Sequence, residues 1–153
     1  MVQIRGGVAT DAAEISALLS TLADRFIVTE FSEEGRRNLL NSMTPAAIEQ
    51  FFADGYRYHV AVDGGEIVGV VGTRDNSHLF HLFVAESYQG QGLSSRLWHV
   101  GRDACLDAGN PGFFNVNASL NAQNVYRRWG FEPIAGIREG GGVRDLPMRM
   151  ALS

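Results

Sequence analysis

The sequence predicts a mixed α/β fold, in which a central mixed sheet of about six or seven strands is flanked by about four helices. Two observations predict it. Several short segments alternate apolar and polar residues, which is the period of a half-buried strand. Other segments repeat apolar residues at intervals of three and four, which is the period of an amphipathic helix. The chain has 153 residues, and we treat residues 1–153 as one domain.

The N-terminal third is predicted to hold one short strand and two helices. Gln3–Arg5 is the strand. Asp11 and Glu14 have the spacing of a capping box at a helix start, and the apolar residues after them share one helix face: Ile15, Leu18, Leu19 and Leu22. Residues 24–42 are polar and show no clear period. Thr44-Pro45 begins the second helix, because proline is favoured at the first helical position.

Three strands follow in the middle of the chain. Residues 58–62 alternate in the strand period and lead into Asp63-Gly64, which is a hairpin signal. Residues 67–71 form the second strand, and residues 78–84 form a third, strongly apolar strand after a turn at 75–77. Strand alternation places His78 and His81, three residues apart, on opposite faces of this strand.

The C-terminal half alternates helices and strands. A long helix runs from Gly92 to Ala108, and a strand follows at Phe113–Asn117. The next helix spans Ala122–Trp129, with Gly130 at its C-terminal end. Two final strands, Ile134–Arg138 and Leu146–Leu152, are joined by a hairpin loop at Gly140–Gly142. Hairpins and helical crossovers in one chain imply a mixed sheet with helices on both faces.

Composition excludes several classes of protein. Thirteen Lys and Arg against seventeen Asp and Glu give a net charge of −4, which lacks the strongly basic footprint of a nucleic-acid binder. No apolar run approaches the ~20 residues of a membrane-spanning helix, and the first residues lack a secretory signal. One cysteine, Cys105, cannot make an internal disulfide or a zinc cage. We therefore expect a cytoplasmic protein with no metal, no membrane partner and no nucleic-acid partner.

The segment Gln89-Gly90-Gln91-Gly92-Leu93-Ser94-Ser95 carries the strongest functional signal. It lies between an apolar strand and a long helix. Glycines let the backbone approach a ligand closely, and the N–H groups of a first helical turn attract anions. The segment therefore predicts a pyrophosphate site. It has no lysine of the P-loop type, and Ser95 stands where the G-x-G-x-x-G dinucleotide fingerprint has its third glycine.

This loop resembles the Q/R-x-x-G-x-G/A signature of the GNAT superfamily of acyl-CoA-dependent N-acetyltransferases, with Ser94 at the last position. Residues 116–131, which include Tyr126 and Gly130-Phe131, are similar to the second motif of that family, N-x-x-A-x-x-[LF]-Y-x-[KR]-x-G-F. The predicted order of elements also matches the family fold. The resemblance implies the acyl-CoA N-acyltransferase fold and direct transfer of an acetyl group from acetyl-CoA to a primary amine.

The resemblance also implies which residues bind acetyl-CoA. The pyrophosphate would bind the backbone N–H groups of the loop: Gln89, Gly90, Gln91, Gly92, Leu93, Ser94 and Ser95. The pantetheine arm would lie along Leu82, Phe83 and Val84, where one backbone N–H would polarise the thioester carbonyl. The family has an asparagine seven residues before its motif tyrosine. That position is Ser119 here, so the contact falls to Ser119 or to nearby Asn121.

Two residues are the catalytic candidates. By the resemblance, Tyr126 would stand near the CoA sulfur and protonate the departing thiolate. An alkylammonium has a pKa of ~10.4, so only about one amine in 2,500 is the free nucleophile at pH 7, which corresponds to roughly 4.6 kcal/mol. A general base or a water relay can offset this. In several family members the base lies six residues before the last apolar residue of the strand, which is His78 here.

The acceptor and the assembly are less determined by the sequence. The resemblance places the acceptor pocket in residues 24–57 and 134–146, and the acceptor is a small-molecule or peptide amine. Acidic residues at 30–34 would favour a cationic amine there. A homodimer is common in the family. The alternative to an enzyme is a catalytically degenerate acyl-CoA-binding module, and CoA release with a panel of amines distinguishes the two.

Overall fold

The computed structural model describes residues 1–27, 32–120, 122–140 and 143–152. Within these residues eight strands form a mixed sheet in the order β1-β2-β3-β4-β5-β8-β6, and β7 also pairs with β8. The strands are β1 (Gln3–Gly6), β2 (Arg57–Asp63), β3 (Glu66–Arg74), β4 (His78–Val84), β5 (Phe113–Ala118), β6 (Glu132–Pro133), β7 (Arg138–Gly140) and β8 (Val143–Ala151). The predicted fold class, a mixed sheet flanked by helices, is confirmed.

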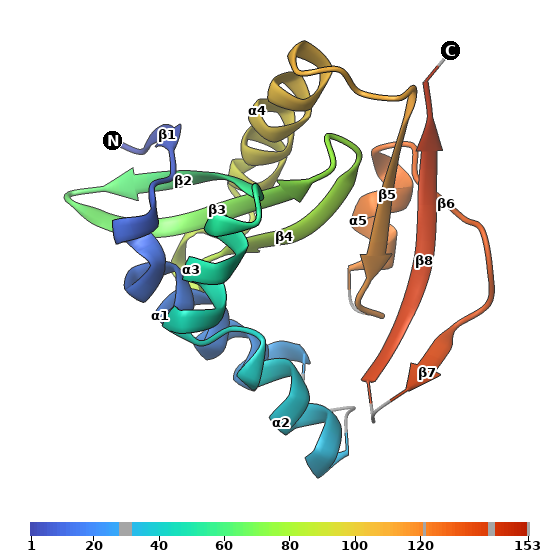
Figure 1. Cartoon of the computed structure of the whole chain (residues 1–153), viewed down its shortest axis with the longest axis horizontal. Coiled ribbons are helices and arrows are strands. Elements are labelled where there is room, and N and C mark those ends of the chain that lie inside the picture. The colour runs from blue at the N-terminus through green and yellow to red at the C-terminus, as the bar shows by residue number, and fades with distance from the viewer. Residues whose placement is uncertain (28–31, 121, 141–142, 153) are drawn as a thin grey trace.

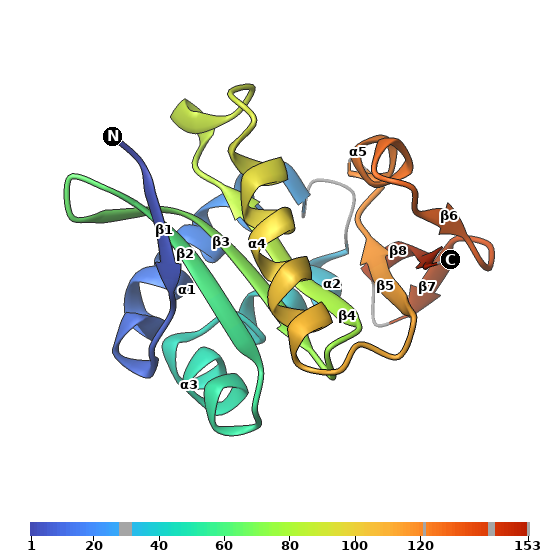
Figure 2. The same cartoon turned by 90° about the horizontal axis from the view of Figure 1, so that it is seen from above.

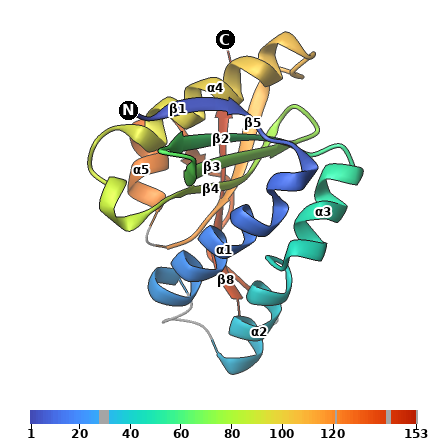
Figure 3. The same cartoon turned by 90° about the vertical axis from the view of Figure 1, so that its left-hand side faces the viewer.

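Helices cover both faces of the sheet. They are α1 (Ala12–Leu22), α2 (Glu33–Asn41), α3 (Pro45–Ala53), α4 (Leu93–Asp107) and α5 (Gln123–Arg128). Figure 3 shows α4 on one side of β1–β4, with α1 and α3 on the other. None of the helices in the described ranges is long and apolar enough to cross a membrane.

Strand alternation divides the core into two layers. Val60 and Val70 lie in the cluster that packs against α1 and α3. Their neighbours Ala61 and Val71 lie in the cluster that packs against α4. Helix α4 approaches the sheet closely, because a Cβ added at Gly69 would stand 2.8 Å from Cδ1 of Leu97. The position of α4, and with it the loop before it, is therefore fixed by direct contact with β3.

The β4–β5 pair is parallel and very short. Only His78 and Leu79 of β4 have partners in β5, namely Asn115 and Val116. The other strand pairs are antiparallel. Beyond this contact β4 and β5 diverge, and in Figures 1 and 2 β5 and β8 run steeply across the direction of β2–β4. The remainder of β4 therefore has one edge without a neighbouring strand.

A β-bulge interrupts the pairing of β3 with β4. Gly72 is opposite His81 and Thr73 is opposite Leu79, so Phe80 is an extra residue on β4. Arg74, two residues after Gly72, is opposite His78. His78 and His81 therefore lie on the same face, and the prediction of opposite faces is wrong. The bulge adds one residue between them and shifts the alternation by one position.

Of the two helix starts predicted from capping residues, the one at Thr44 is confirmed and the capping box at Asp11 and Glu14 is not. Thr44 is the N-cap of α3, where its hydroxyl accepts the N–H of Ala47 at 3.1 Å. Asp11 and Glu14 do not form a capping box. The Asp11 carboxylate instead accepts the N–H of Val8 and binds Arg5, and Glu14 accepts the N–H of Ile67 at 3.1 Å. The two carboxylates therefore bond to residues outside α1, in the segment before it and in β3.

Two segments depart from the prediction. The polar region 24–42 contains most of a π-helical turn, Ala23–Ile27, and the helix α2. The predicted strand Ile134–Arg138 is wrong, because residues 134–137 are irregular and pairing occurs on either side, in β6 and β7. Pro133 lacks an N–H for the ladder. The β7–β8 hairpin agrees with the predicted loop, although Gly141 and Gly142 lie outside the described residues.

Candidate active site

The loop between β4 and α4 has a backbone that requires glycine. Gly90 and Gly92 have φ angles of +77° and +79°, in the left-handed region. Nothing lies within 4 Å of a Cβ added at either residue, so the angle and not crowding explains the glycines. The Gln89 side chain donates to the carbonyl of Val84 at 2.9 Å, which ties the loop to the end of β4.

The first turn of α4 presents free backbone donors. Gly92 is the N-cap, and the Arg96 N–H is bonded to the Gly92 carbonyl at 3.1 Å. The preceding amides, those of Leu93, Ser94 and Ser95, are the ones that a helix leaves without an intrahelical acceptor. They carry the positive end of the helix dipole. The loop and the helix start therefore form a cradle of unpaired donors suited to an anion, and the pyrophosphate site stays a prediction.

A cavity of about 430 Å³ opens between this cradle, β4 and α5. Nine of the predicted CoA-binding residues line it: Leu82, Phe83, Val84, Gln89, Gly90, Gly92, Leu93, Ser94 and Ser119. Gln91 and Ser95 are not among the lining residues, and Asn121 lies outside the described residues. Sequence reasoning missed Leu22, Tyr88, Ala122 and Val125. Of these, Ala122 and Val125 share the apolar stripe of Tyr126 and could have been found by helical spacing.

The free edge of β4 faces the gap toward β5. The Ala85 N–H donates to the Val68 carbonyl at 2.8 Å, so the backbone groups of Ala85 point toward β3. Directions alternate along an antiparallel ladder. The N–H and C=O groups of Leu82 and Val84 consequently point away from β3, into the gap. This backbone edge can pair with an extended ligand as a neighbouring strand would.

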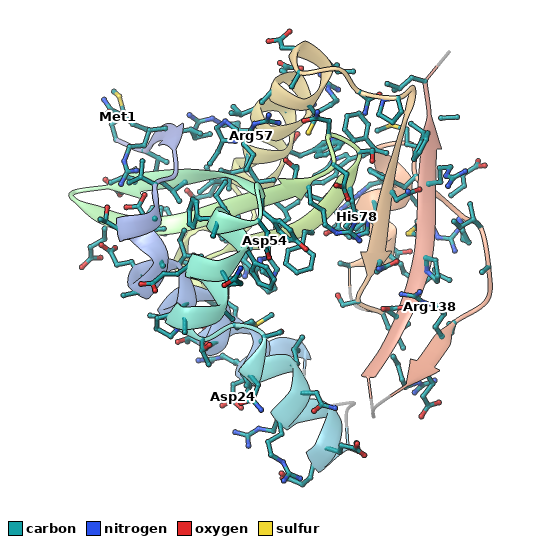
Figure 4. The ribbon with its side chains drawn as sticks, viewed as in Figure 1. Met1, Asp24, Asp54, Arg57, His78 and Arg138 are labelled. Atoms are coloured by element: carbon teal, nitrogen blue, oxygen red, sulfur yellow. The ribbon has the colours of Figure 1, made fainter. Side chains whose placement is uncertain are left out.

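A second cavity, of about 280 Å³, lies on the other side of the same gap. Five residues line both cavities: Leu82, Phe83, Ser119, Ala122 and Tyr126. The second cavity also contains His78, His81 and Phe80 from β4, residues 39, 42 and 43, and Arg144 and Asp145 from β8. His78 lies where β4 meets β5 (Figure 4). Two ligands, one in each cavity, would meet at the shared residues.

Burial changes the acid–base properties of the lining residues. Tyr126 is 8% exposed, and its burial raises the pKa of its hydroxyl. His78 is 7% exposed, and burial, together with the positive charge of Arg74, lowers its pKa to about 4. Burial lowers the pKa of His81 to about 3, and its Nδ1 is hydrogen-bonded to the Tyr58 hydroxyl at 3.0 Å. At pH 7 both histidines are neutral and the tyrosine is protonated.

The acidic residues of α2 do not line the second cavity. Glu33 and Glu34 are exposed at the helix start, whereas Leu39 and Ser42 are the residues from α2 and its C-cap that face the cavity. Glu30, the third acidic residue of this prediction, lies outside the described residues, so selection of a cationic amine by acidic residues finds support only if Glu30 supplies it. In the described ranges, no group of three or more His, Cys, Asp or Glu is placed to hold a metal ion.

Comparison with solved structures shows which class of protein has this fold. The chain is similar to a GCN5-related N-acetyltransferase from Rhodopseudomonas palustris, with 19% identity, a TM-score of 0.83, and coverage of 98% of this chain and 95% of that one. It is also similar to the PaiA N-acetyltransferase of Thermoplasma acidophilum in complex with coenzyme A, with 14% identity, a TM-score of 0.74 and 99% coverage of both chains. The fold is that of acetyltransferases.

The sequence itself then gives the family. The family model described as the acetyltransferase (GNAT) domain matches residues 27–152. The chain belongs to the GNAT acetyltransferase family. A search among curated proteins finds no match.

Proposed function

We propose that this protein transfers an acetyl group from acetyl-CoA to a primary amine by direct attack in a ternary complex. The observation that carries the proposal is the meeting of the two cavities at Leu82, Phe83 and Tyr126. A donor in the larger cavity and an acceptor in the smaller one would touch at these residues. Direct transfer requires such contact, because the amine must reach the thioester carbonyl while both substrates are bound.

The larger cavity suits CoA. Its cradle combines left-handed glycines with the unpaired amides of a helix start, and such amides bind pyrophosphate without a lysine. The backbone edge at Leu82 and Val84 would pair with the amides of the pantetheine arm. Bound acetyl-CoA would supply an acetyl group activated as a thioester. A β4 N–H would then polarise its carbonyl, as an oxyanion hole does.

Tyr126 would protonate the departing thiolate. Its hydroxyl is protonated at pH 7 and so has a proton to donate, and its raised pKa makes it a weaker acid than an exposed tyrosine. Its position in the lining of both cavities brings it to the point where transfer occurs.

His78 would accept the proton of the ammonium, directly or through a water. It is neutral at pH 7 and therefore able to accept. With a pKa of about 4 it is a weaker base than an exposed histidine, which favours a relay over full capture of the proton.

Cofactor binding and turnover are tested separately. Acetyl-CoA at ~100 times its Kd adds about 2.7 kcal/mol of stability, which should raise the Tm by roughly 5–10 °C. NADH serves as the control nucleotide. Tyr126→Phe should retain this shift and lose kcat, whereas Tyr56→Phe, outside both cavities, should keep kcat. Binding without CoA release for any amine would indicate the binding module instead.

The base is tested by the pH dependence of kcat/KM. If His78 removes the proton after the ammonium binds, the wild-type rate changes little between pH 6 and 8. Without that assistance only the free amine reacts, and its fraction rises about tenfold per pH unit. His78→Ala should therefore show the steep profile. His99→Ala, an exposed histidine of α4, is the control. Parallel profiles for wild type and His78→Ala would exclude the assignment.

A further inference from the structure

Arg144 is a cation with an unmet hydrogen-bonding requirement in the second cavity. It lies on β8 and lines that cavity but not the larger one. Its Nε is buried and has no hydrogen-bond partner among the described residues. A buried guanidinium N–H without an acceptor is costly. An acceptor atom on a ligand would satisfy it once the side chain turns toward the cavity, since the Nε has almost no accessible surface.

Arg144 has no ion-pair partner among the neighbouring charged residues that the structure describes. Asp145 is the lining carboxylate, and Arg138 already binds it through two contacts of 2.9 and 3.1 Å. Glu139 lies opposite Arg144 in the β7–β8 ladder, but the two form no ion pair in the described part of the chain. These four charges sum to zero, but Asp145 is paired with Arg138, so Arg144 is the charged lining residue without an ion-pair partner in the described part of the chain.

The other residues that line the second cavity add no charge near neutral pH. His78 and His81 carry no charge at neutral pH, because burial lowers the pKa of each. The charges of Arg74 and Arg138 also act on His78 and lower its pKa further, whereas Asp75 opposes them. Leu39, Met43 and Phe80 add apolar surface.

We infer that the acceptor amine also carries a carboxylate, which Arg144 binds. This rests on the proposed function, since it assumes that the second cavity holds the acceptor. A guanidinium binds carboxylates in a planar, paired geometry, and the single unpaired guanidinium of Arg144 matches the single charge of a carboxylate better than the double charge of a phosphate. The volume of about 280 Å³ lies below the usual range of drug-sized sites. The acceptor is therefore of the size and chemistry of an apolar amino acid.

The two ends of such an acceptor would have separate places. The amine must reach the residues that both cavities share, near Tyr126 and Leu82. The carboxylate would lie at Arg144, and the apolar side chain would pack on Phe80 and Met43. Each end of the molecule then meets a group of matching chemistry.

Matched acceptors test the inference. Leucine, leucinamide and isoamylamine share one apolar group, and only leucine carries the carboxylate; rates are compared per total amine, because the proposed mechanism binds the ammonium form. Loss of a hydrogen bond to a charged group corresponds to about a 10- to 100-fold decrease in kcat/KM. We expect kcat/KM for leucine to exceed both others by that factor. O-phosphoethanolamine is included, and a preference for it over leucine would overturn the carboxylate assignment.

Variants assign the effect to Arg144. Arg144→Gln should lower kcat/KM for leucine about 10- to 100-fold, mainly by raising KM, and should leave kcat/KM for isoamylamine nearly unchanged. Arg144→Lys should retain part of the kcat/KM for leucine that Arg144→Gln loses. Arg149→Gln, on the same strand and outside the cavity, is the matched control. Glu139→Gln tests the cross-strand neighbour and should leave KM for leucine unchanged. An equal loss with leucine and isoamylamine in Arg144→Gln would overturn the inference.

A binding readout separates this inference from the proposed function. With CoA present, leucine should raise the Tm of the wild type and not that of Arg144→Gln. If amines are acetylated without regard to the carboxylate, the inference fails and the proposed function stands. If no amine in the set releases CoA and leucine gives no Tm shift, the proposed function fails and the inference fails with it.

Discussion

His81 should make the free energy of unfolding depend on pH between 8 and 5. It is 6% exposed, and burial lowers its pKa from 6.5 to about 3. The unfolded chain therefore binds a proton in this range and the folded chain does not. Stability is unaffected above the unfolded pKa and falls as the pH drops below it.

The loss of stability between pH 8 and pH 5 depends little on the pKa of His81 in the folded chain. At pH 5 an unfolded histidine of pKa 6.5 is almost fully protonated, which corresponds to about 2 kcal/mol relative to pH 8. A folded pKa anywhere below 4 leaves this figure nearly unchanged. His78, with a pKa of about 4, and His59, whose pKa burial also lowers, add losses of the same sign. The effect of His81 must therefore be taken as a difference from a variant.

The assay is urea unfolding of the wild type and of His81→Gln at pH 8, 7, 6 and 5. Glutamine keeps a polar atom near the Tyr58 hydroxyl and does not titrate. The variant should be less stable at pH 8, yet lose about 2 kcal/mol less than the wild type on going to pH 5. Equal losses would refute the reasoning. Titration of the His81 ring by NMR gives a second measurement, and a ring pKa near 6.5 would also refute it.

Three other predictions concern the loop and the core. Gly92→Ala should lower the free energy of unfolding by about 1–2 kcal/mol, because the φ of Gly92 is +79°, and it should also weaken acetyl-CoA binding. Gly109 also has a positive φ but lies outside both cavities. Gly109→Ala should therefore lose stability and keep its affinity for acetyl-CoA, as measured by calorimetry. Trp98→Ala should cost about 3–5 kcal/mol in urea unfolding, since Trp98 is 1% exposed among aromatic rings. Thr44→Ala should cost about 1 kcal/mol in the same assay through loss of the α3 cap.

Local signals predicted the part of the site that is contiguous in sequence. The loop 89–95 and the stripe around Tyr126 were found because turn glycines and helical periodicity act over a few residues. The same reasoning predicted β2, β3, β4 and α4. These segments position the larger cavity, and the family resemblance then named nine of the predicted CoA-binding residues that line it.

Signals that depend on pairing between distant segments were not available from the sequence. Ile134 and Ile137 look like strand residues, yet they are 55% and 53% exposed, because β8 pairs with the residues on either side of them. Arg144 reaches the second cavity only because β8 lies beside β5. Neither the burial of its Nε nor its place with His78 in the lining of one cavity has a local sequence signature.

The bulge at Phe80 shows how one pairing detail determines the chemistry of the site. Leu79 and Leu82 both pack toward the α4 layer, although three residues separate them, and His78 and His81 share the opposite face. Without the extra residue, regular alternation from Leu82 would turn Leu79 toward α3 and His78 toward the α4 layer. His78 would then no longer share a face with His81. The bulge is therefore what brings the two histidines of β4 to one face of the strand, while the backbone of Leu82 and Val84 stays directed into the gap.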